Sequence, residues 1–229
     1  MKKEALIIAL IMVFSLSAKG QGTRTLYIQV AYGVEAEIGV GEAAIPTDAF
    51  LTSKAKPLYA IGAFVQLPIA GSSFNLKPQL RYRQTQIRAV AGEVSSASFS
   101  MNSHLVEIPL QLQYYPVRDS RFLPFIFVEP FVGYCLGAKA EGFLFDPSDI
   151  GLPDMTLIAF NGNRIESEYL NRFEFGTCVG LGIEWRSFQF SVSYRRNFNK
   201  IGKERPYSLY EVGDSKYQNL SLSIGIFLP

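Results

Sequence analysis

The chain predicts an all-β fold, an eight-stranded antiparallel up-and-down transmembrane β-barrel with short periplasmic turns and long extracellular loops. The first observation is alternation: in the last segment Leu220, Leu222, Ile224 and Ile226 alternate with polar or small residues. A period of two gives a strand one apolar and one polar face. The second observation is that short and long connections alternate between such segments, which is typical of outer-membrane barrels.

The amino terminus predicts export. Two lysines precede an apolar run, Ala5–Leu16, and small residues follow it up to Gly20. This order is that of a secretory signal peptide, and the run is shorter than the roughly 20 residues of a transmembrane helix. We therefore expect a signal peptide at residues 1–20 and one barrel domain at 21–229. Removing the peptide takes the formal net charge from +2 to about zero, so the charge does not indicate a nucleic-acid partner.

Eight segments carry the strand pattern. In chain order they are Leu26–Ile38, Leu58–Leu67, Phe74–Ile87, Phe99–Tyr115, Leu123–Ala140, Tyr169–Trp185, Phe188–Phe198 and Tyr217–Leu228. The connections 68–73, 116–122 and 186–187 are short, whereas 39–57, 88–98, 141–168 and 199–216 are long. No segment after the predicted signal is long and apolar enough for a transmembrane helix, so a membrane-spanning fold has to be a closed barrel.

The segments place large apolar residues on one parity. Examples are Leu26, Ile28, Val30, Tyr32 and Val34 in the first segment; Phe74, Leu76, Leu80 and Tyr82 in the third; Val106, Ile108, Leu110, Leu112 and Tyr114 in the fourth; and Phe188, Phe190, Val192 and Tyr194 in the seventh. Several aromatic residues of this parity lie towards strand ends, where girdles meet lipid headgroups: Tyr32, Tyr82, Tyr114, Tyr134, Trp185 and Tyr194.

The opposite parity carries nearly all the strand charges. They are Glu35, Glu37, Lys77, Arg81, Arg83, Glu107, Glu129, Glu174, Glu184 and Arg195. The interior of an eight-stranded barrel is only wide enough for its own side chains, and the large apolar residues are too many to fit there. We therefore expect the apolar face to meet lipid and the charges to pair in the lumen as a structural network. A soluble barrel with an apolar interior is the alternative.

The two cysteines, Cys135 and Cys178, share the polar parity on neighbouring predicted strands. A cross-strand disulfide between them would suit an oxidising periplasm. Two reduced, buried thiols are the alternative, because the register that decides between them does not follow from the sequence.

The third long connection is apolar for a solvated loop. Phe143, Phe145, Leu157 and Phe160 form its predicted interaction surface. Either the loop folds over the barrel mouth, partly by extending the flanking strands, or it offers this surface to another protein.

Catalytic and metal chemistry have few candidates. His104 lies near Ser100 and Ser103, and His with Ser could serve acyl transfer, but no motif adds an acidic partner. One His and two Cys without short ligand spacing do not indicate a zinc site, so we expect no metal and no cofactor.

Several motifs carry a family resemblance. They are Glu107-Ile-Pro-Leu-Gln-Leu-Gln-Tyr-Tyr-Pro116, Pro124-Phe-Ile-Phe-Val-Glu-Pro-Phe-Val-Gly-Tyr134, Phe175-Gly-Thr-Cys-Val-Gly-Leu-Gly-Ile-Glu184, Gly62-Ala-Phe-Val-Gln-Leu-Pro68 and Lys77-Pro-Gln-Leu-Arg-Tyr82. In this order they resemble the PorT-like outer-membrane β-barrel family of Bacteroidota. The resemblance implies an eight-stranded barrel in a group whose namesake takes part in type IX protein secretion and gliding. The end of the chain departs from the usual aromatic last residue of such barrels, because Leu228 and Pro229 follow Phe227.

These features together predict a non-enzymatic protein of the Gram-negative outer membrane that supports envelope assembly or type IX-like secretion through its extracellular loops. Its expected partners are outer-membrane lipids and proteins of secretion or envelope assembly. A small-solute pore and an outer-membrane acyltransferase-like enzyme are the alternatives.

Overall fold

The computed structural model describes residues 30–44, 51–91, 98–117, 120–143, 159–164, 171–200 and 216–228. Within them the chain forms ten strands: β1 (Ala31–Ala44), β2 (Leu51–Lys54), β3 (Lys56–Pro68), β4 (Phe74–Ala91), β5 (Ser98–Tyr114), β6 (Phe122–Phe143), β7 (Ala159–Arg164), β8 (Phe173–Trp185), β9 (Phe188–Asn197) and β10 (Lys216–Phe227). No helix among these residues is long and apolar enough to cross a membrane.

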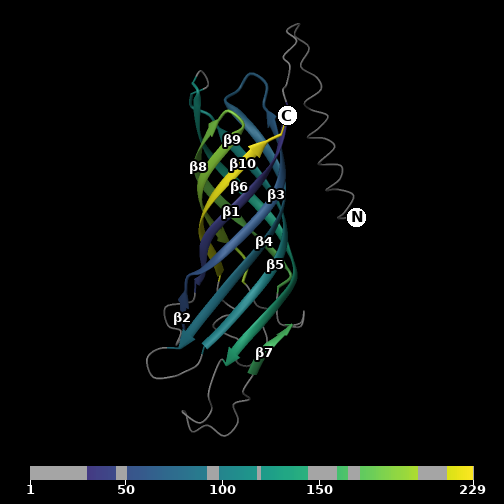
Figure 1. Ribbon diagram of the computed structural model, residues 1–229, viewed down its shortest axis with the longest axis vertical. Coiled ribbons are helices and arrows are strands. Elements are labelled where there is room, and N and C mark those ends of the chain that lie inside the picture. Colours follow the sequence, from purple (N-terminus) through teal and green to yellow (C-terminus); the bar gives the residue numbers. More distant parts are fainter. Residues whose placement is uncertain are drawn as a thin grey trace.

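Eight of the strands close into an antiparallel barrel (Figure 1). Each of β1, β3, β4, β5, β6, β8, β9 and β10 pairs with the next one in this order, and β10 pairs with β1 from Gly33↔Phe227 to Ala44↔Lys216. The short β2 and β7 lie outside this circle and pair with the outer ends of β4 and β6. The predicted fold class, a closed eight-stranded antiparallel barrel, is confirmed.

The faces of the barrel follow the alternation of the sequence. Most apolar side chains of even number on β1 and β5 are exposed, whereas most odd-numbered neighbours on the same strands are buried inside. Leu80, Ile108, Leu181 and Leu222 are examples of large apolar residues that point outward. A contiguous exposed apolar surface of this extent needs lipid around it.

Short turns and both ends of the barrel-forming chain share one end of the molecule. The β3–β4 turn contains Gly71 at a φ of 71°, and the two-residue β8–β9 turn places Arg186 at a φ of 56°, which residues other than glycine adopt rarely. The amide of Leu228 donates to the carbonyl of Tyr32 at this end. Outer-membrane barrels keep short turns in the periplasm, which orients this one.

The strand bounds differ from the predicted ones mainly at the opposite end. β1 continues to Ala44, β4 to Ala91 and β6 to Phe143, and β2 and β7 form within segments that we predicted to be loops. Beyond the membrane both faces of a strand meet water, so hydrophobic alternation no longer marks where a strand ends. The predicted signal peptide, residues 1–20, lies outside the described residues.

Candidate functional site: the charged lumen

Arg81 lies at the centre of the lumen and is buried. Its guanidinium nitrogens are 3.3 Å from Glu35, 3.1 Å from Glu37 and 3.2 Å from Glu129. Gln79 accepts a further hydrogen bond from Arg81 Nη2 at 2.8 Å. Because guanidinium has five N–H donors in a fixed plane, it can bind several carboxylates at once in this way.

A second cluster surrounds Glu107 on β5. Arg83 Nε is 3.1 Å from one of its oxygens, and Arg195 donates from two nitrogens at 2.9 and 2.6 Å. Arg83 also binds Glu37 at 3.0 Å, which joins the two clusters. Lys77 extends the network towards the turn end, where it pairs with Glu35 and donates to Gln189 at 2.6 Å.

The network is balanced in charge. Its cations are Lys77, Arg81, Arg83 and Arg195, and its carboxylates are Glu35, Glu37, Glu107 and Glu129, all buried. Buried charge is costly unless each group is paired and hydrogen-bonded, and here four of each sign meet. These interlocked side chains occupy the middle of the tube, which leaves little room for a solute.

The other two predicted lumen acids take neutral partners. Glu174 accepts a hydrogen bond from Asn197 at 2.7 Å, and Glu184 accepts one from Tyr115 at 2.9 Å. Glu174 lies beside Glu107, because both residues pair with Gly133, whereas Glu184 lies next to the β8–β9 turn. The structure therefore brings eight of the ten predicted charges together and leaves these two at its margins.

Phenylalanine rings fill much of the remaining lumen, and sequence analysis did not place them there. Phe125, Phe127 and Phe131 are buried on the inner face of β6. Each is paired across the strands with a glycine of β8, namely Gly182, Gly180 and Gly176. Cross-strand Phe–Gly pairs of this kind let the ring cover the exposed backbone. The sequence did indicate this position, because the three phenylalanines have the same parity on the strand as Glu129, which was assigned to the lumen.

Two of the inner rings also contact network cations. The Arg195 guanidinium carbon is 3.3 Å from the Phe131 ring centroid, and Lys77 Nζ is 4.1 Å from that of Phe64. Such cation–π contacts stabilise a cation that has lost its water. The ion pairs and the phenylalanine rings therefore pack together in a single core inside the barrel.

Of the two alternatives for the cysteines, the structure shows two separate, buried thiols and no disulfide. The ladder places Cys178 opposite Glu129, which is six residues from Cys135 on β6, so the two cysteines are roughly 20 Å apart along the strand. A disulfide needs Cα atoms within about 7 Å. Both residues are buried, and no bond joins them. The two cysteines do share the inner face, as the sequence indicates. The register between β6 and β8 decides how far apart they lie.

The proposed Ser–His arrangement does not form either. His104 points outward and its Nδ1 is 2.7 Å from the Tyr82 hydroxyl, whereas Ser103 is buried on the inner face. Ser100 shares the outward parity but is four residues away, or roughly 13 Å. Neither serine can reach the imidazole from these positions. Among the described residues no group of three or more His, Cys, Asp or Glu could hold a metal ion.

The predicted loop surface is only partly described. Gly142 pairs with Phe160 and Phe143 with Ala159, so these residues belong to the β6–β7 ladder. Phe145 and Leu157 lie outside the described residues. The ladder shows that the third long connection begins as an extension of β6 past the rim, at the lower end in Figure 1.

Comparison with known proteins agrees with this architecture. The family model described as outer membrane protein beta-barrel domain matches residues 14–202. Among solved structures the chain is similar to Neisserial surface protein A, with 12% identity, a TM-score of 0.44 and coverage of 85% of this chain and 96% of that one. It is also similar to Ail, the attachment invasion locus protein of Yersinia pestis, with 10% identity, a TM-score of 0.41 and coverage of 86% and 98%.

A third similar structure is the outer membrane protein OprG of Pseudomonas aeruginosa, with 11% identity, a TM-score of 0.37 and coverage of 86% of this chain and 91% of that one. None of the curated proteins matches the chain significantly.

Proposed function

Because the chain belongs to the outer membrane protein beta-barrel domain family, we propose that it is a closed, non-enzymatic barrel that supports envelope assembly or protein secretion through its extracellular side. The observation that carries this proposal is the β6–β7 hairpin. β6 has 22 residues, more than any other described strand, and β7 pairs with its outer end. An ordered arm beyond the rim can present residues to another protein.

The filled lumen supports a role outside the tube. Arg81 and Arg83 each bridge acids from different strands, so they tie β1, β4, β5 and β6 together across the lumen. A solute pathway would have to break several buried ion pairs, which is costly. The sequence motifs that resemble PorT-like barrels point in the same direction, towards a secretion-associated role of the type IX kind.

The first experiment is co-purification from native membranes after mild detergent extraction. Residues 142–160, the outer part of the hairpin and its connection, are replaced by a short Asn-Gly turn. The barrel part of β6 keeps its pairing with β5 and β8 in this variant. We expect envelope-assembly or secretion proteins to accompany the full chain and to be lost with the variant. Recovery of the barrel alone from both would contradict the proposal.

Two further measurements address the alternatives. In planar bilayers the purified barrel should show no steady ion conductance, since the lumen is occupied; stable single-channel steps would favour the pore. Lipid acyl transfer that is lost in His104→Ala would favour an enzyme, and we expect no such transfer.

A further inference from the structure

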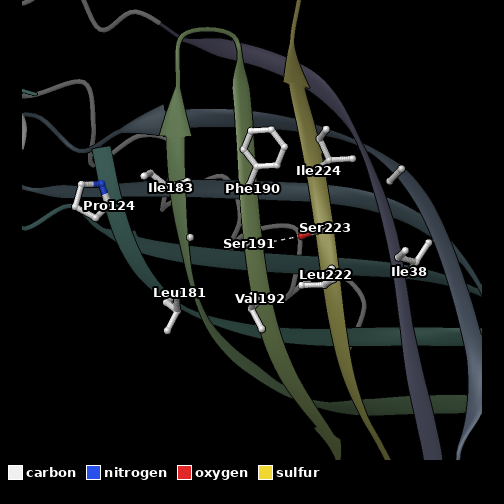
Figure 2. Close-up of a pocket in the computed structure, with 12 residues that line it drawn as sticks. Ile38, Pro124, Leu181, Ile183, Phe190, Ser191, Val192, Leu222, Ser223 and Ile224 are labelled. Carbon is white, nitrogen blue, oxygen red and sulfur yellow. Dashed lines mark hydrogen bonds between the residues drawn. The ribbon is translucent and has the colours of Figure 1, made fainter. Parts of the chain in front are cut away.

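A hollow of ligand size lies in the outer wall of the barrel (Figure 2). It has a volume of about 620 Å³ and crosses β6, β8, β9, β10 and β1. Ligand sites usually measure about 300–1,000 Å³. The side chains around it are apolar: Ile38, Leu181, Ile183, Phe190, Val192 and Leu222 are among them. An apolar lining of this kind suits a hydrocarbon chain.

Two rows of outward side chains border the hollow: Ile183, Phe190, Ile224 and Ala36 form one, and Leu181, Val192, Leu222 and Ile38 form the other. Gly182, Ser191 and Ser223 line the floor between the rows with their backbone, because these residues face the lumen. Ala36 is the small outward residue at the β1 side of the hollow. The hydroxyls of Ser191 and Ser223 bond to one another on the inner side of the wall, as the dashed line in Figure 2 shows. The hydroxyls are therefore satisfied by each other, and the surface that faces outward stays apolar.

A run of aromatic rings leads from the hollow to the turn end. Phe190 stacks on Phe188 with centroids 6.3 Å apart, Phe188 on Trp185 at 6.5 Å, and Trp185 on Phe122 at 6.1 Å. Aromatic residues at this position of a barrel wall mark the level of the lipid headgroups. A series of neighbouring aromatic rings thus connects the hollow with the turn end of the barrel.

Two arginines stand at the end of this run. The Arg186 guanidinium lies over the Trp185 ring, 5.1 Å from its centroid. Phe122 pairs with Trp185 in an antiparallel ladder. Arg121, just before Phe122, therefore lies next to Arg186, just after Trp185. Both are exposed. Glu184 beside them points inward and accepts from Tyr115, so it does not neutralise them.

The distance from the turn end to the hollow matches the length of one lipid in a leaflet. Trp185 and Leu181 are four residues apart on β8, which is roughly 13 Å along the strand. Half of a hydrocarbon core of about 30 Å is close to this length. An acyl chain whose phosphate lies at the arginines would therefore reach the deeper row of the hollow.

We propose that this wall binds an anionic glycerophospholipid of the periplasmic leaflet, with an acyl chain in the hollow and the phosphate between Arg121 and Arg186. Positive charge, aromatic rings and an apolar hollow occur in the order in which such a lipid presents phosphate, glycerol and chain. The site is independent of the role proposed for the β6–β7 hairpin, and it would hold the barrel at a set depth and rotation relative to its lipids.

The test is native mass spectrometry of the full barrel in mild detergent, with phosphatidylglycerol, cardiolipin or phosphatidylethanolamine added separately. We expect the two anionic lipids to be retained in preference to phosphatidylethanolamine, and the comparison between them shows which one is the better ligand. The double variant Arg121→Gln/Arg186→Gln should weaken retention by about 30-fold, if each arginine contributes the usual attraction of a basic residue near an anionic surface. Arg88→Gln/Arg172→Gln, a matched double change at the outer end, should leave retention unchanged.

A second arm tests the hollow itself. Ala36→Phe would fill it, whereas Ala63→Phe changes another exposed alanine, on β3, that does not line it. We expect the first variant alone to lose retention, with both showing the gel mobility of a folded barrel before heating. Retention of all lipids alike, an unaffected arginine variant, or a second copy of the chain covering this wall would each overturn the proposal.

Discussion

Glu107 and Ile108 are adjacent on β5 and face opposite environments. Glu107 is 0% exposed and binds two arginines, whereas Ile108 is 65% exposed and faces outward. Every charge of the inner network has named partners at hydrogen-bond distance. The outer face consists mainly of apolar side chains, with polar pairs such as Tyr82 and His104 among them. Each position of the inner face therefore requires a particular side chain, whereas most positions of the outer face require only an apolar one.

The comparison explains how a narrow membrane barrel is stable. Folding cannot bury the outer apolar residues against one another, because they face lipid, so cohesion across the tube has to come from the lumen. Ion pairs, amide hydrogen bonds and Phe–Gly pairs supply it from strands far apart in the sequence. Changes on the two faces should consequently differ in size and in chemical tolerance.

The largest effect is expected from Glu107→Gln. The substitution keeps the shape but leaves Arg83 and Arg195 without this carboxylate, and breaking a buried pair costs about 3–5 kcal/mol. The free energy of unfolding by urea from lipid vesicles measures it. Glu42→Gln is the matched control, since Glu42 is only partly buried and accepts one bond from Gln218. A loss below about 1 kcal/mol for Glu107→Gln would show that the arginines are satisfied in some other way.

Ile108→Arg tests the neighbouring outward position. An arginine on the lipid face of a barrel costs about 2–4 kcal/mol near the midplane. Ile108→Val, in contrast, should be nearly neutral, because the outer face tolerates any apolar side chain. The same unfolding measurement applies. If the arginine were tolerated as well as valine, this face would not meet hydrocarbon.

Gly182→Ala tests the shape of the inner face without changing its charge. A Cβ at this position would lie 2.3 Å from Cζ of Phe125 and 2.5 Å from the carbonyl oxygen of Phe190, so the chain must shift. We expect a loss of about 1–3 kcal/mol, the usual cost of overpacking. Gly225→Ala is the control, because its nearest neighbour would be 3.4 Å away. Equal unfolding free energies for the two variants would contradict the Phe–Gly packing.

The smallest effect concerns the cysteines. Because Cys135 and Cys178 are separated along the barrel, reductant should change neither the mass of the protein nor its unfolding free energy. Alkylation of the unfolded, unreduced protein should add two labels. An unlabelled protein under these conditions would mean that the two cysteines are joined after all.

Sequence patterns were sufficient for the architecture. Alternation from β1 to β10 and the alternating lengths of the connections predict the eight barrel strands, because a period of two assigns each residue to a face. They also separate charge from apolar residues correctly, as Arg81 and Leu80 illustrate. The patterns did not find β2, β7 or the outer ends of β4 and β6, where water on both sides removes the hydrophobic signal.

Partners within each face depended on the tertiary structure. The sequence alone determined that Glu107, Arg83 and Arg195 share a face, but only the closed barrel decided that they meet, that Phe125 covers Gly182 and that Cys135 and Cys178 lie apart. The reason is physical. Parity depends on local backbone geometry, whereas the register between strands is set by the stagger that closure imposes on all eight at once.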